Sequence, residues 1–303
     1  MTQVATQAGP VNAEPQRQDD VAPERGVRGR VALALLVPML GVFAVGFLVP
    51  LGTVARFSFN DYEPGVGQTS AWTVSQYSAV FSSPTDSGAI LRTFELGLIT
   101  AVISALLSYP LALAITRGPR WARTPLTAMV MMPLLVSVVV KTFGWQILLS
   151  SEAFPQKTLD ALGIPVKLLF TQTGVSIGLV HTYMPFMALS LITALAAIDR
   201  RTEEAAASLG SSRWRVFWTI TFPQSINGLI AGFVLTFAAS MSALVTPQLL
   251  GGGRVPTVVT SIFRQVETVQ NYPYGAALGI LLLAATLALL FVQSAVLGRR
   301  ERG

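Results

Sequence analysis

The sequence has no cysteine and only one histidine, His181, among its 303 residues. Without cysteine the chain can form no disulfide, no thiolate metal site and no thiol nucleophile. With only one histidine, the chain also lacks the side chains that most metal sites and acid–base sites use as ligands or proton carriers. Charged residues make up only 12% of the chain, against about 25% in an ordinary soluble domain. Since 52% of the residues are hydrophobic, lipid must cover part of the apolar mass.

Long apolar segments separate the charged stretches. A bilayer core of about 30 Å needs about 20 apolar helical residues. Six segments meet or approach this length, and we predict a transmembrane helix over each: residues 31–57, 90–115, 125–149, 174–198, 226–250 and 274–297. Prolines within them, such as Pro110 and Pro185, are tolerated in a packed bundle. The predicted fold class is all-α, a polytopic membrane protein with six transmembrane helices.

The two ends of the chain are polar. Residues 1–30 are rich in Gln, Pro, Asp, Glu and Arg and contain no apolar run, which predicts a disordered tail. A cleaved signal peptide would have its apolar region near the start, so we expect an uncleaved first span. Residues 298–303 form a second short tail, which leaves residues 31–297 as one membrane domain.

The positions of the basic residues predict the orientation. Arginines concentrate in the N-terminal tail, in residues 117–123 and 200–215, and at the C-terminus. Because basic loops stay in the cytoplasm, both termini and these two connections are predicted to be cytoplasmic. The net charge of +6 does not indicate nucleic-acid binding, since the basic residues lie between apolar blocks and form no single stripe with interleaved aromatics.

Residues 199–225, between the fourth and fifth spans, form a charged insertion: DRRTEEAAASLGSSRWRVFWTITFPQS. Glu203 and Glu204 favour the start of a helix, where acidic side chains oppose the helix dipole. Gly210 suits a turn to a second helix, which Ser211 or Ser212 can cap. This second helix is predicted to end at Pro223. Its apolar residues are Trp214, Phe217, Trp218 and Ile220. Such a helix could lie flat on the membrane surface, since Trp and Arg suit that position.

The spacing within this insertion favours another role. Two alanines follow a glutamate, three residues separate them from a glycine, and nine more precede an isoleucine near a proline. These positions are Glu204, Ala205, Ala206, Gly210, Ile220 and Pro223. The pattern resembles the EAA coupling signature of the permease subunits of ABC importers. Only Phe222, where the usual residue is Leu, departs from it.

The resemblance extends over residues 31–297. The segments RTFELGLITAVISALLSYPLALAITRG and MMPLLVSVVVKTFGWQILLS, with the loop QLLGGGRVPTVV, are similar to spermidine/putrescine-type permeases. Lys141 stands where that pattern has Arg, so its charge is retained. The resemblance implies a type I ABC importer permease fold that forms half of a pathway for a polyamine. The wider group also carries ferric iron, phosphonates and other small solutes.

The resemblance also implies the partners. These are cytoplasmic ABC ATPase subunits, a second and related permease subunit, and an extracytoplasmic solute-binding protein on the external loops. The EAA residues would seat in the ATPase, with Glu204 available for charge-assisted contacts. The chain has no phosphate-binding loop, which needs Gly-Lys followed by Ser or Thr, because none of its lysines follows a glycine. We therefore expect no cofactor and no catalytic residue, with ATP bound by the partner.

Charged residues within the spans are costly and usually paired or functional. Arg92 and Glu95 are three residues apart and can pair on one helix, and Lys141 is expected to find a partner across the bundle. One interpretation is an ion-pair lock between helices. The other is that polar and aromatic residues line the translocation path: Glu95, Lys141, Trp145 and Tyr183. We expect His181 to form a hydrogen bond in the bundle and not to bind a ligand.

Two other classes of membrane protein remain as alternatives. An ion-coupled secondary transporter ordinarily has internal repeats or membrane carboxylates, but the sequence shows no clear repeat and, besides Glu95, almost no intramembrane acid. An intramembrane hydrolase would need an acid or nucleophile near His181, and none lies at helical spacing. ATP dependence of uptake would separate the first alternative from an ABC importer.

Overall fold

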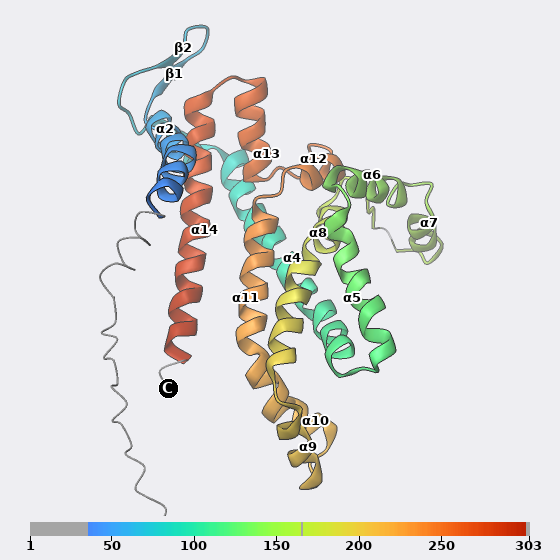
Figure 1. The fold of residues 1–303 in the computed structure, drawn as a ribbon. Helices are drawn as coiled ribbons and strands as arrows, with labels where there is room; N and C mark the ends of the chain where they lie inside the picture. Colours follow the sequence, from blue (N-terminus) through green and yellow to red (C-terminus); the bar gives the residue numbers. More distant parts are fainter. Residues whose placement is uncertain (1–35, 165, 301–303) are drawn as a thin grey trace, which may run out of the picture. The chain divides into compact units, whose positions relative to one another are not determined.

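The computed structural model describes residues 36–164 and 166–300, and the chain divides into two units, residues 1–52 and 53–303. Figure 1 shows a helical protein with one short hairpin of β1 (Asp61–Glu63) and β2 (Gly67–Thr69). The predicted tail over residues 1–30, the start of the first span at 31–35 and the last residues of the C-terminal tail, 301–303, lie outside the described residues.

The first predicted span is helical where it is described. Leu36–Phe57 is one helical stretch of 22 residues, and its most apolar 18-residue window has a mean hydropathy of 2.0. It includes a π-helical turn, η1 (Ala44–Leu48), and continues as α2 (Val49–Phe57). Large apolar side chains such as Met39 and Val42 are exposed along it. This surface is suited to contact with lipid.

Three long helices form the core of the second unit: α4 (Pro84–Arg117), α8 (Gln172–Ala197) and α11 (Phe222–Met241). Ser83 caps α4 by accepting a hydrogen bond from the Asp86 backbone N–H. Small residues allow close approach, as in other membrane bundles. A Cβ atom added at Gly228 on α11 would collide with Ala194 on α8, and one at Gly232 would lie 2.9 Å from the Met187 sulfur.

The third predicted span is not one straight helix. It consists of α5 (Arg120–Leu135) and α6 (Val138–Leu148), which are bent by 100° at residues 136–137. The break leaves carbonyl groups at the end of α5 without helical partners. The ammonium group of Lys141 donates to the Pro133 carbonyl at 2.7 Å and so satisfies one of them. Counting the bent pair as one span gives six candidate spans in the described chain, and five without it.

The fifth predicted span also differs from the structure. It was expected to reach residue 250, but α11 ends at Met241 and a separate helix, α12 (Val245–Gly251), follows. Pro247 is the third residue of α12, where its missing N–H would have no helical partner in any case. Thr142 on α6 and Thr246 on α12 are hydrogen-bonded at 3.3 Å, which brings the two short helices together.

Short helices occupy the predicted external loops. They are α3 (Ser75–Ser82), α7 (Phe154–Ala161), α13 (Val258–Phe263) and the π-helical η3 (Arg264–Thr268). The chain then enters its last helix, α14 (Tyr272–Arg300). The span predicted over residues 274–297 is therefore confirmed as a helix, as are those over 90–115 and 174–198.

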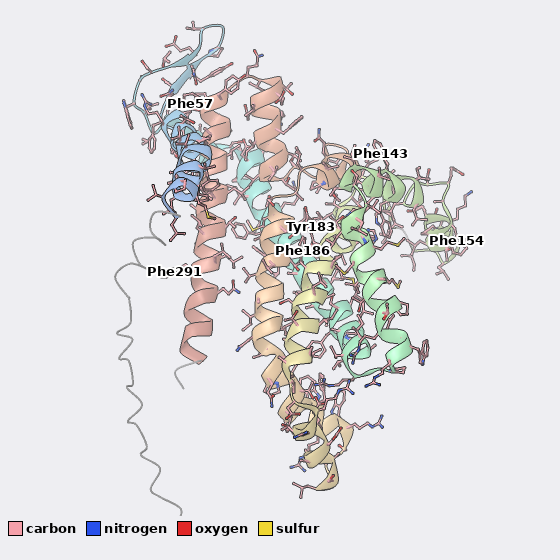
Figure 2. The ribbon with its side chains drawn as sticks, in the orientation of Figure 1. Phe57, Phe143, Phe154, Tyr183, Phe186 and Phe291 are labelled. Carbon is pink, nitrogen blue, oxygen red and sulfur yellow. The ribbon has the colours of Figure 1, made fainter. Side chains whose placement is uncertain are left out.

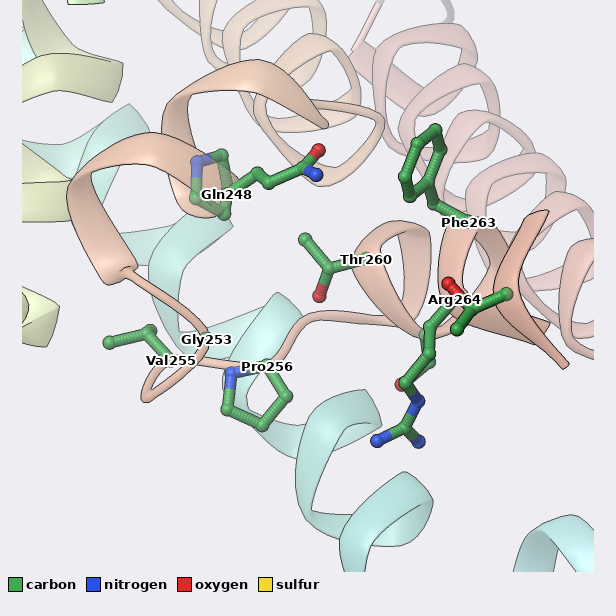
Figure 3. Close-up of a pocket in the computed structure, with 10 residues that line it drawn as sticks. Gln248, Gly253, Val255, Pro256, Thr260, Phe263 and Arg264 are labelled. Carbon is green, nitrogen blue, oxygen red and sulfur yellow. The ribbon is translucent and has the colours of Figure 1, made fainter. Parts of the chain in front are cut away.

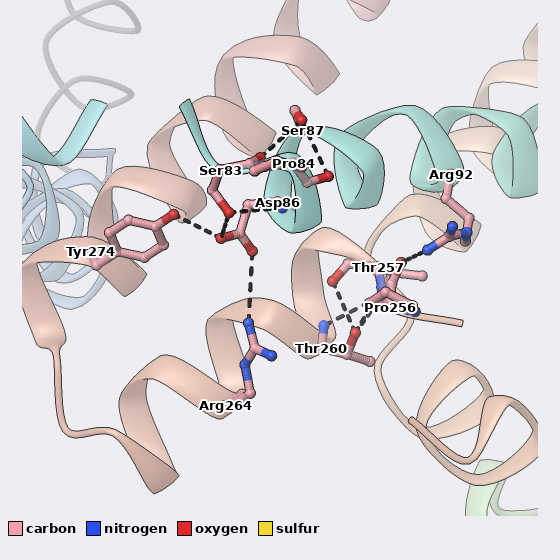
Figure 4. A network of polar contacts seen from close by, with 10 residues as sticks. All are labelled: Ser83, Pro84, Asp86, Ser87, Arg92, Pro256, Thr257, Thr260, Arg264 and Tyr274. Carbon is pink, nitrogen blue, oxygen red and sulfur yellow. Dashed lines mark hydrogen bonds and ion pairs between the residues drawn. The ribbon is translucent and has the colours of Figure 1, made fainter. Parts of the chain in front are cut away.

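A buried polar network joins α4, α13–η3 and α14 (Figure 4). Asp86 is buried, and its Oδ2 atom accepts hydrogen bonds from the Tyr274 hydroxyl at 2.7 Å and the Ser83 hydroxyl at 3.0 Å. The guanidinium of Arg264 lies 3.9 Å from Asp86 Oδ1. Next to this network, the Thr93 hydroxyl accepts from the Val258 backbone N–H at 2.9 Å. These contacts fix the start of α4 against the last third of the chain.

Candidate coupling site and translocation path

The insertion between α8 and α11 folds as a helix–turn–helix at one end of the second unit (Figure 1). Its helices are α9 (Arg200–Ser208) and α10 (Arg213–Val216). Asp199 caps α9 by accepting from the Arg201 backbone N–H at 2.9 Å, and Ser212 caps α10. Gly210 turns the chain between them with φ +86°, a left-handed conformation that favours glycine. The predicted turn and the Ser212 cap are confirmed.

Pro223 does not end the second helix, contrary to the sequence prediction. The chain runs from α10 through a π-helical segment, η2 (Phe217–Thr221), directly into α11. The Phe222 N–H donates to the carbonyl of Phe217, five residues earlier. Pro223 is the second residue of α11 and has no backbone N–H to donate to the preceding turn. The wider turn accommodates the proline within one continuous helical path from Arg213 to Met241.

The EAA residues differ in exposure. On α9, Glu204 and Ala205 are exposed and Ala206 is half-buried. The turn residue Gly210 is exposed, and the side chain of Leu209 before it is 88% exposed. Beyond the turn, Ile220 and Pro223 lie in the helical path that leads into α11, half-buried and exposed respectively. The exposed face of this element is therefore formed by α9, the turn and the start of α10, where Trp214 is 71% exposed.

Glu203, the residue before the motif glutamate, connects three elements. Its Oε1 atom lies 2.9 Å from Arg117 Nη2 at the end of α4 and accepts from the Thr221 hydroxyl in η2 at 2.8 Å. The side chains of Arg117 and Glu203 are only 21% and 18% exposed. Sequence reasoning placed Glu203 only as a helix-start residue. The feature of the sequence that could have indicated this role is Arg117, a basic residue at the end of an earlier span that lies far from Glu203 in the sequence.

Aromatic rings reinforce the same junction. Phe217 packs edge-on against Tyr109 of α4, with ring centroids 5.6 Å apart, and Trp218 lies 5.1 Å from both Phe217 and Phe222. The Tyr109 hydroxyl and the Ser225 hydroxyl are hydrogen-bonded at 2.7 Å. The helix–turn–helix is thus packed against α4 as well as continuous with α11.

A groove of about 640 Å³ runs along α4, α6 and α8. Its wall is mostly apolar and includes Trp145, with Gln172, Ser176 and His181 among the polar exceptions. The Trp145 and His181 rings meet edge-on at 5.5 Å. Glu95 accepts a hydrogen bond from the Gln172 side chain at 3.2 Å. Trp145 therefore lines this groove, and Glu95 is bonded to a residue that lines it.

The other two residues predicted for the path lie elsewhere. Tyr183 packs against the buried core cluster and stacks on Phe186, with ring centroids 6.3 Å apart (Figure 2). Lys141 is engaged with the Pro133 carbonyl. Neither residue is part of the groove wall.

The predicted ion pairs are absent from the described residues. Arg92 donates to the Pro256 carbonyl at 3.3 Å instead of pairing with Glu95, and Lys141 contacts no carboxylate. His181 Nδ1 is buried without a hydrogen-bond partner in the same part of the chain, so this atom does not form the hydrogen bond expected of His181. An ion-pair lock at these positions is therefore wrong, because backbone carbonyls at helix breaks and loops take the two cations.

A smaller pocket of about 240 Å³ opens between α12 and α13–η3 (Figure 3). Gln248, Thr260 and Arg264 contribute polar side chains to it. Arg264 belongs both to this pocket and to the Asp86 network. The described residues contain no group of three or more His, Asp or Glu side chains that could hold a metal ion.

Comparisons with known proteins identify the family. The chain is 29% identical over 261 residues to the spermidine/putrescine transport system permease protein PotB of Haemophilus influenzae, covering 85% of this chain and 87% of the relative. It is 27% identical over 220 residues to the sulfate transport system permease protein CysW of Synechococcus elongatus, covering 71% and 76%.

A solved structure confirms the predicted fold. A chain of the bacterial alginate ABC transporter, crystallised in complex with an alginate pentasaccharide-bound periplasmic protein, superposes with a TM-score of 0.71. The match has 17% sequence identity and covers 88% of this chain and 93% of that one. The family described as binding-protein-dependent transport system inner membrane component matches residues 97–302, more than half of the sequence, and the chain therefore belongs to this family of ABC importer permeases.

Proposed function

We propose that this permease carries a polyamine of the spermidine or putrescine type. Family membership makes the chain a non-catalytic, multi-pass inner-membrane subunit, with ATP bound by a separate ATPase, and sets aside the secondary transporter and the intramembrane hydrolase. The observation that carries the choice of solute is the similarity to PotB over 85% of the chain. The similarity to a sulfate permease keeps other small solutes, including ferric iron and phosphonate, as the alternative.

The groove along α4, α6 and α8 supports a cationic solute. Trp145 offers an aromatic face, which attracts ammonium groups, and Glu95 supplies the nearby carboxylate through its contact with Gln172. A second, related permease subunit would close this groove from the open side and complete the pathway. Of the four path residues predicted from the sequence, Glu95 and Trp145 are the two that we retain.

The exposed face of α9 and the Gly210 turn are proposed as the ATPase-coupling site. The residues assigned to it are Glu204, Ala205, Ala206, Gly210, Ile220 and Pro223. The small alanines allow close approach, and Glu204 is free to bond a cationic partner. The Glu203 junction then connects this site to α4 and α11. In this arrangement residues 199–225 form the coupling loop of a membrane domain that spans residues 31–297.

The opposite end of the second unit is proposed to receive the extracytoplasmic solute-binding protein. The pocket with Gln248, Thr260 and Arg264 presents side chains that can hydrogen-bond a protein surface. The solved relative in complex with its periplasmic protein supports such docking. With this arrangement, both termini and the α9–α10 end face the cytoplasm.

Uptake by the reconstituted transporter tests the solute. The permease, its ATPase, its second permease subunit and its binding protein in liposomes should accumulate labelled spermidine or putrescine when ATP is supplied, and not sulfate. Glu95→Gln should weaken polyamine uptake because it removes the carboxylate next to the groove, while Glu152→Gln, an exposed external carboxylate, serves as the control. Uptake of sulfate without polyamine would overturn the proposed solute and leave the importer assignment unaffected.

A further inference from the structure

A third cavity, of about 540 Å³, lies at the α9–α10 end of the second unit. It is formed where α4 and α8 end and where α5 and α9 begin. Three arginines line it, Arg117, Arg123 and Arg200, together with apolar residues of α8 such as Ile192 and Ala196. We propose that this cavity binds the phosphate-bearing headgroup of an anionic phospholipid.

The level of the cavity in the membrane fits a lipid headgroup. The apolar spans α4 and α8 end at Arg117 and Ala197, and both residues line the cavity. Trp121, in the first turn of α5, is 81% exposed, and exposed tryptophans are typical of the membrane–water interface. The cavity thus lies where the hydrocarbon core gives way to the headgroup layer.

The arginines retain free hydrogen-bond donors. Arg123 donates from Nε to the Ile115 carbonyl at 3.1 Å and from Nη2 to the Thr116 carbonyl at 3.2 Å, and Arg200 donates to the same Thr116 carbonyl. Each guanidinium has five N–H donors, so most remain available. Neither Arg123 nor Arg200 forms an ion pair with a carboxylate among the described residues. In addition, the buried Nε of Arg117 has no hydrogen-bond partner in that part of the chain.

The other charged groups at the cavity do not cancel this charge. Arg117 is neutralised by Glu203 at 2.9 Å. Asp199 also lines the cavity, and its Oδ1 accepts from the Arg201 backbone N–H at 2.9 Å. Capping of the α4 C-terminus explains the three carbonyl contacts, but it accounts neither for the remaining donors nor for the open volume.

The apolar wall favours a lipid over an acidic surface of the ATPase. Ile192 and Ala196 belong to the membrane-spanning part of α8, so an occupant must present both an anion and hydrocarbon. A phospholipid does both, whereas a soluble protein would have to insert a side chain into the span. Basic pockets between transmembrane helices on the cytoplasmic side are known to hold anionic headgroups.

Lipid binding by the purified full-length chain tests the proposal. Native mass spectrometry in detergent would compare phosphatidylglycerol with phosphatidylcholine for the wild type, Arg123→Gln/Arg200→Gln, and the control Arg213→Gln/Arg215→Gln on α10. Loss of two arginines near the headgroup should weaken phosphatidylglycerol binding about ten- to thirtyfold and leave phosphatidylcholine binding unchanged. The control should bind both lipids as the wild type does.

Three outcomes with the isolated chain would overturn the inference. They are equal affinity of the wild type for the two lipids, an equal loss in the control, and displacement of phosphatidylglycerol by millimolar inorganic phosphate, which would indicate a soluble anion. A fourth outcome, in the assembled transporter, would also overturn it. If assembly with the ATPase displaces the lipid and Arg123→Gln/Arg200→Gln no longer binds the ATPase, these arginines contact the ATPase instead. Should the glutamine variant fail to fold, Arg123→Lys/Arg200→Lys keeps the charge and should keep the lipid preference. None of these readouts depends on which solute is transported.

Discussion

Among single residues, the adjacent Glu203 and Glu204 have opposite surroundings. Glu203 is held between Arg117 and Thr221, while the side chain of Glu204 is exposed. The sequence motif identifies Glu204. The contacts of Glu203 come from residues that are distant in the chain, and so the sequence alone could not single it out.

Glu203→Ala should destabilise the isolated chain. It leaves the partly buried Arg117 without its carboxylate and Thr221 without its acceptor, so we expect a loss of about 1–2 kcal/mol in the free energy of unfolding. Thermal unfolding of the chain in detergent would measure it. Glu204→Ala is the matched control and should unfold as the wild type does, while binding the ATPase less tightly. Equal melting curves for the two variants would contradict the structural role of Glu203.

A double-mutant cycle with Arg117→Gln isolates the pair. The two single substitutions and the double should be non-additive, because the residues share one ion pair. An additive cycle would mean that the 2.9 Å contact contributes nothing to stability, and Thr221 alone would then explain the effect of Glu203.

At the level of secondary-structure elements, the contact of α8 with α11 depends on small residues. A Cβ atom at Gly228 would collide with that of Ala194 and lie 3.0 Å from the Ser190 carbonyl oxygen. Gly228→Ala should therefore destabilise the chain by about 1–3 kcal/mol through overpacking. Gly279→Ala on α14, where nothing lies within 4 Å, is the control and should be neutral or stabilising. Melting temperatures of the two purified variants would measure the difference. Equal melting temperatures would mean that α8 and α11 can move apart at Gly228 without a loss of stability.

Two substitutions in the turn between α9 and α10 can separate the effect of an added charge from the effect of backbone conformation. Gly210 has φ +86° and open space around it. Gly210→Asp should insert and fold but lose coupling, because it places a charge on the face proposed to enter the ATPase. Gly210→Asn tolerates the same backbone conformation without the charge and should retain most uptake. ATP hydrolysis and solute uptake, measured together in liposomes, would reveal the uncoupling. Normal uptake by the Asp variant would refute the assignment.

The elements also show how far the sequence predicts the fold. Hydropathy located the helices α4, α8 and α14, because long apolar runs have few alternatives in a membrane. It missed the bend at residues 136–137 and the end of α11 at Met241. Hydropathy does not register the contacts made there: Lys141 donates to the backbone carbonyl of Pro133, eight residues earlier, and Thr142 is hydrogen-bonded to Thr246, 104 residues later. The passage of the helix through Pro223 depends on a π turn, which no residue pattern marked.

For the whole molecule, the orientation in the membrane is the main prediction. The chain has no native cysteine, so single cysteines can report the side of each end without background. Ser211→Cys in the α9–α10 turn should react with a membrane-impermeant maleimide only after the inner membrane is opened. Ser151→Cys, between α6 and α7, should react in cells with only the outer membrane permeabilised. The reverse pattern would contradict cytoplasmic termini.

The two ends of residues 199–225, the proposed coupling loop, are attached to the bundle differently. Ile198 and Asp199, between α8 and α9, are both extended, with ψ 124° and ψ 119°, whereas α10 passes into α11 without a break. The connection to α8 is therefore not helical, whereas the connection to α11 is continuous helix. If the ATPase displaces the α9–α10 turn, we expect the continuous helix to pass that displacement on to α11. ATP-driven movement is therefore expected to reach the pathway through α11 before it reaches α8.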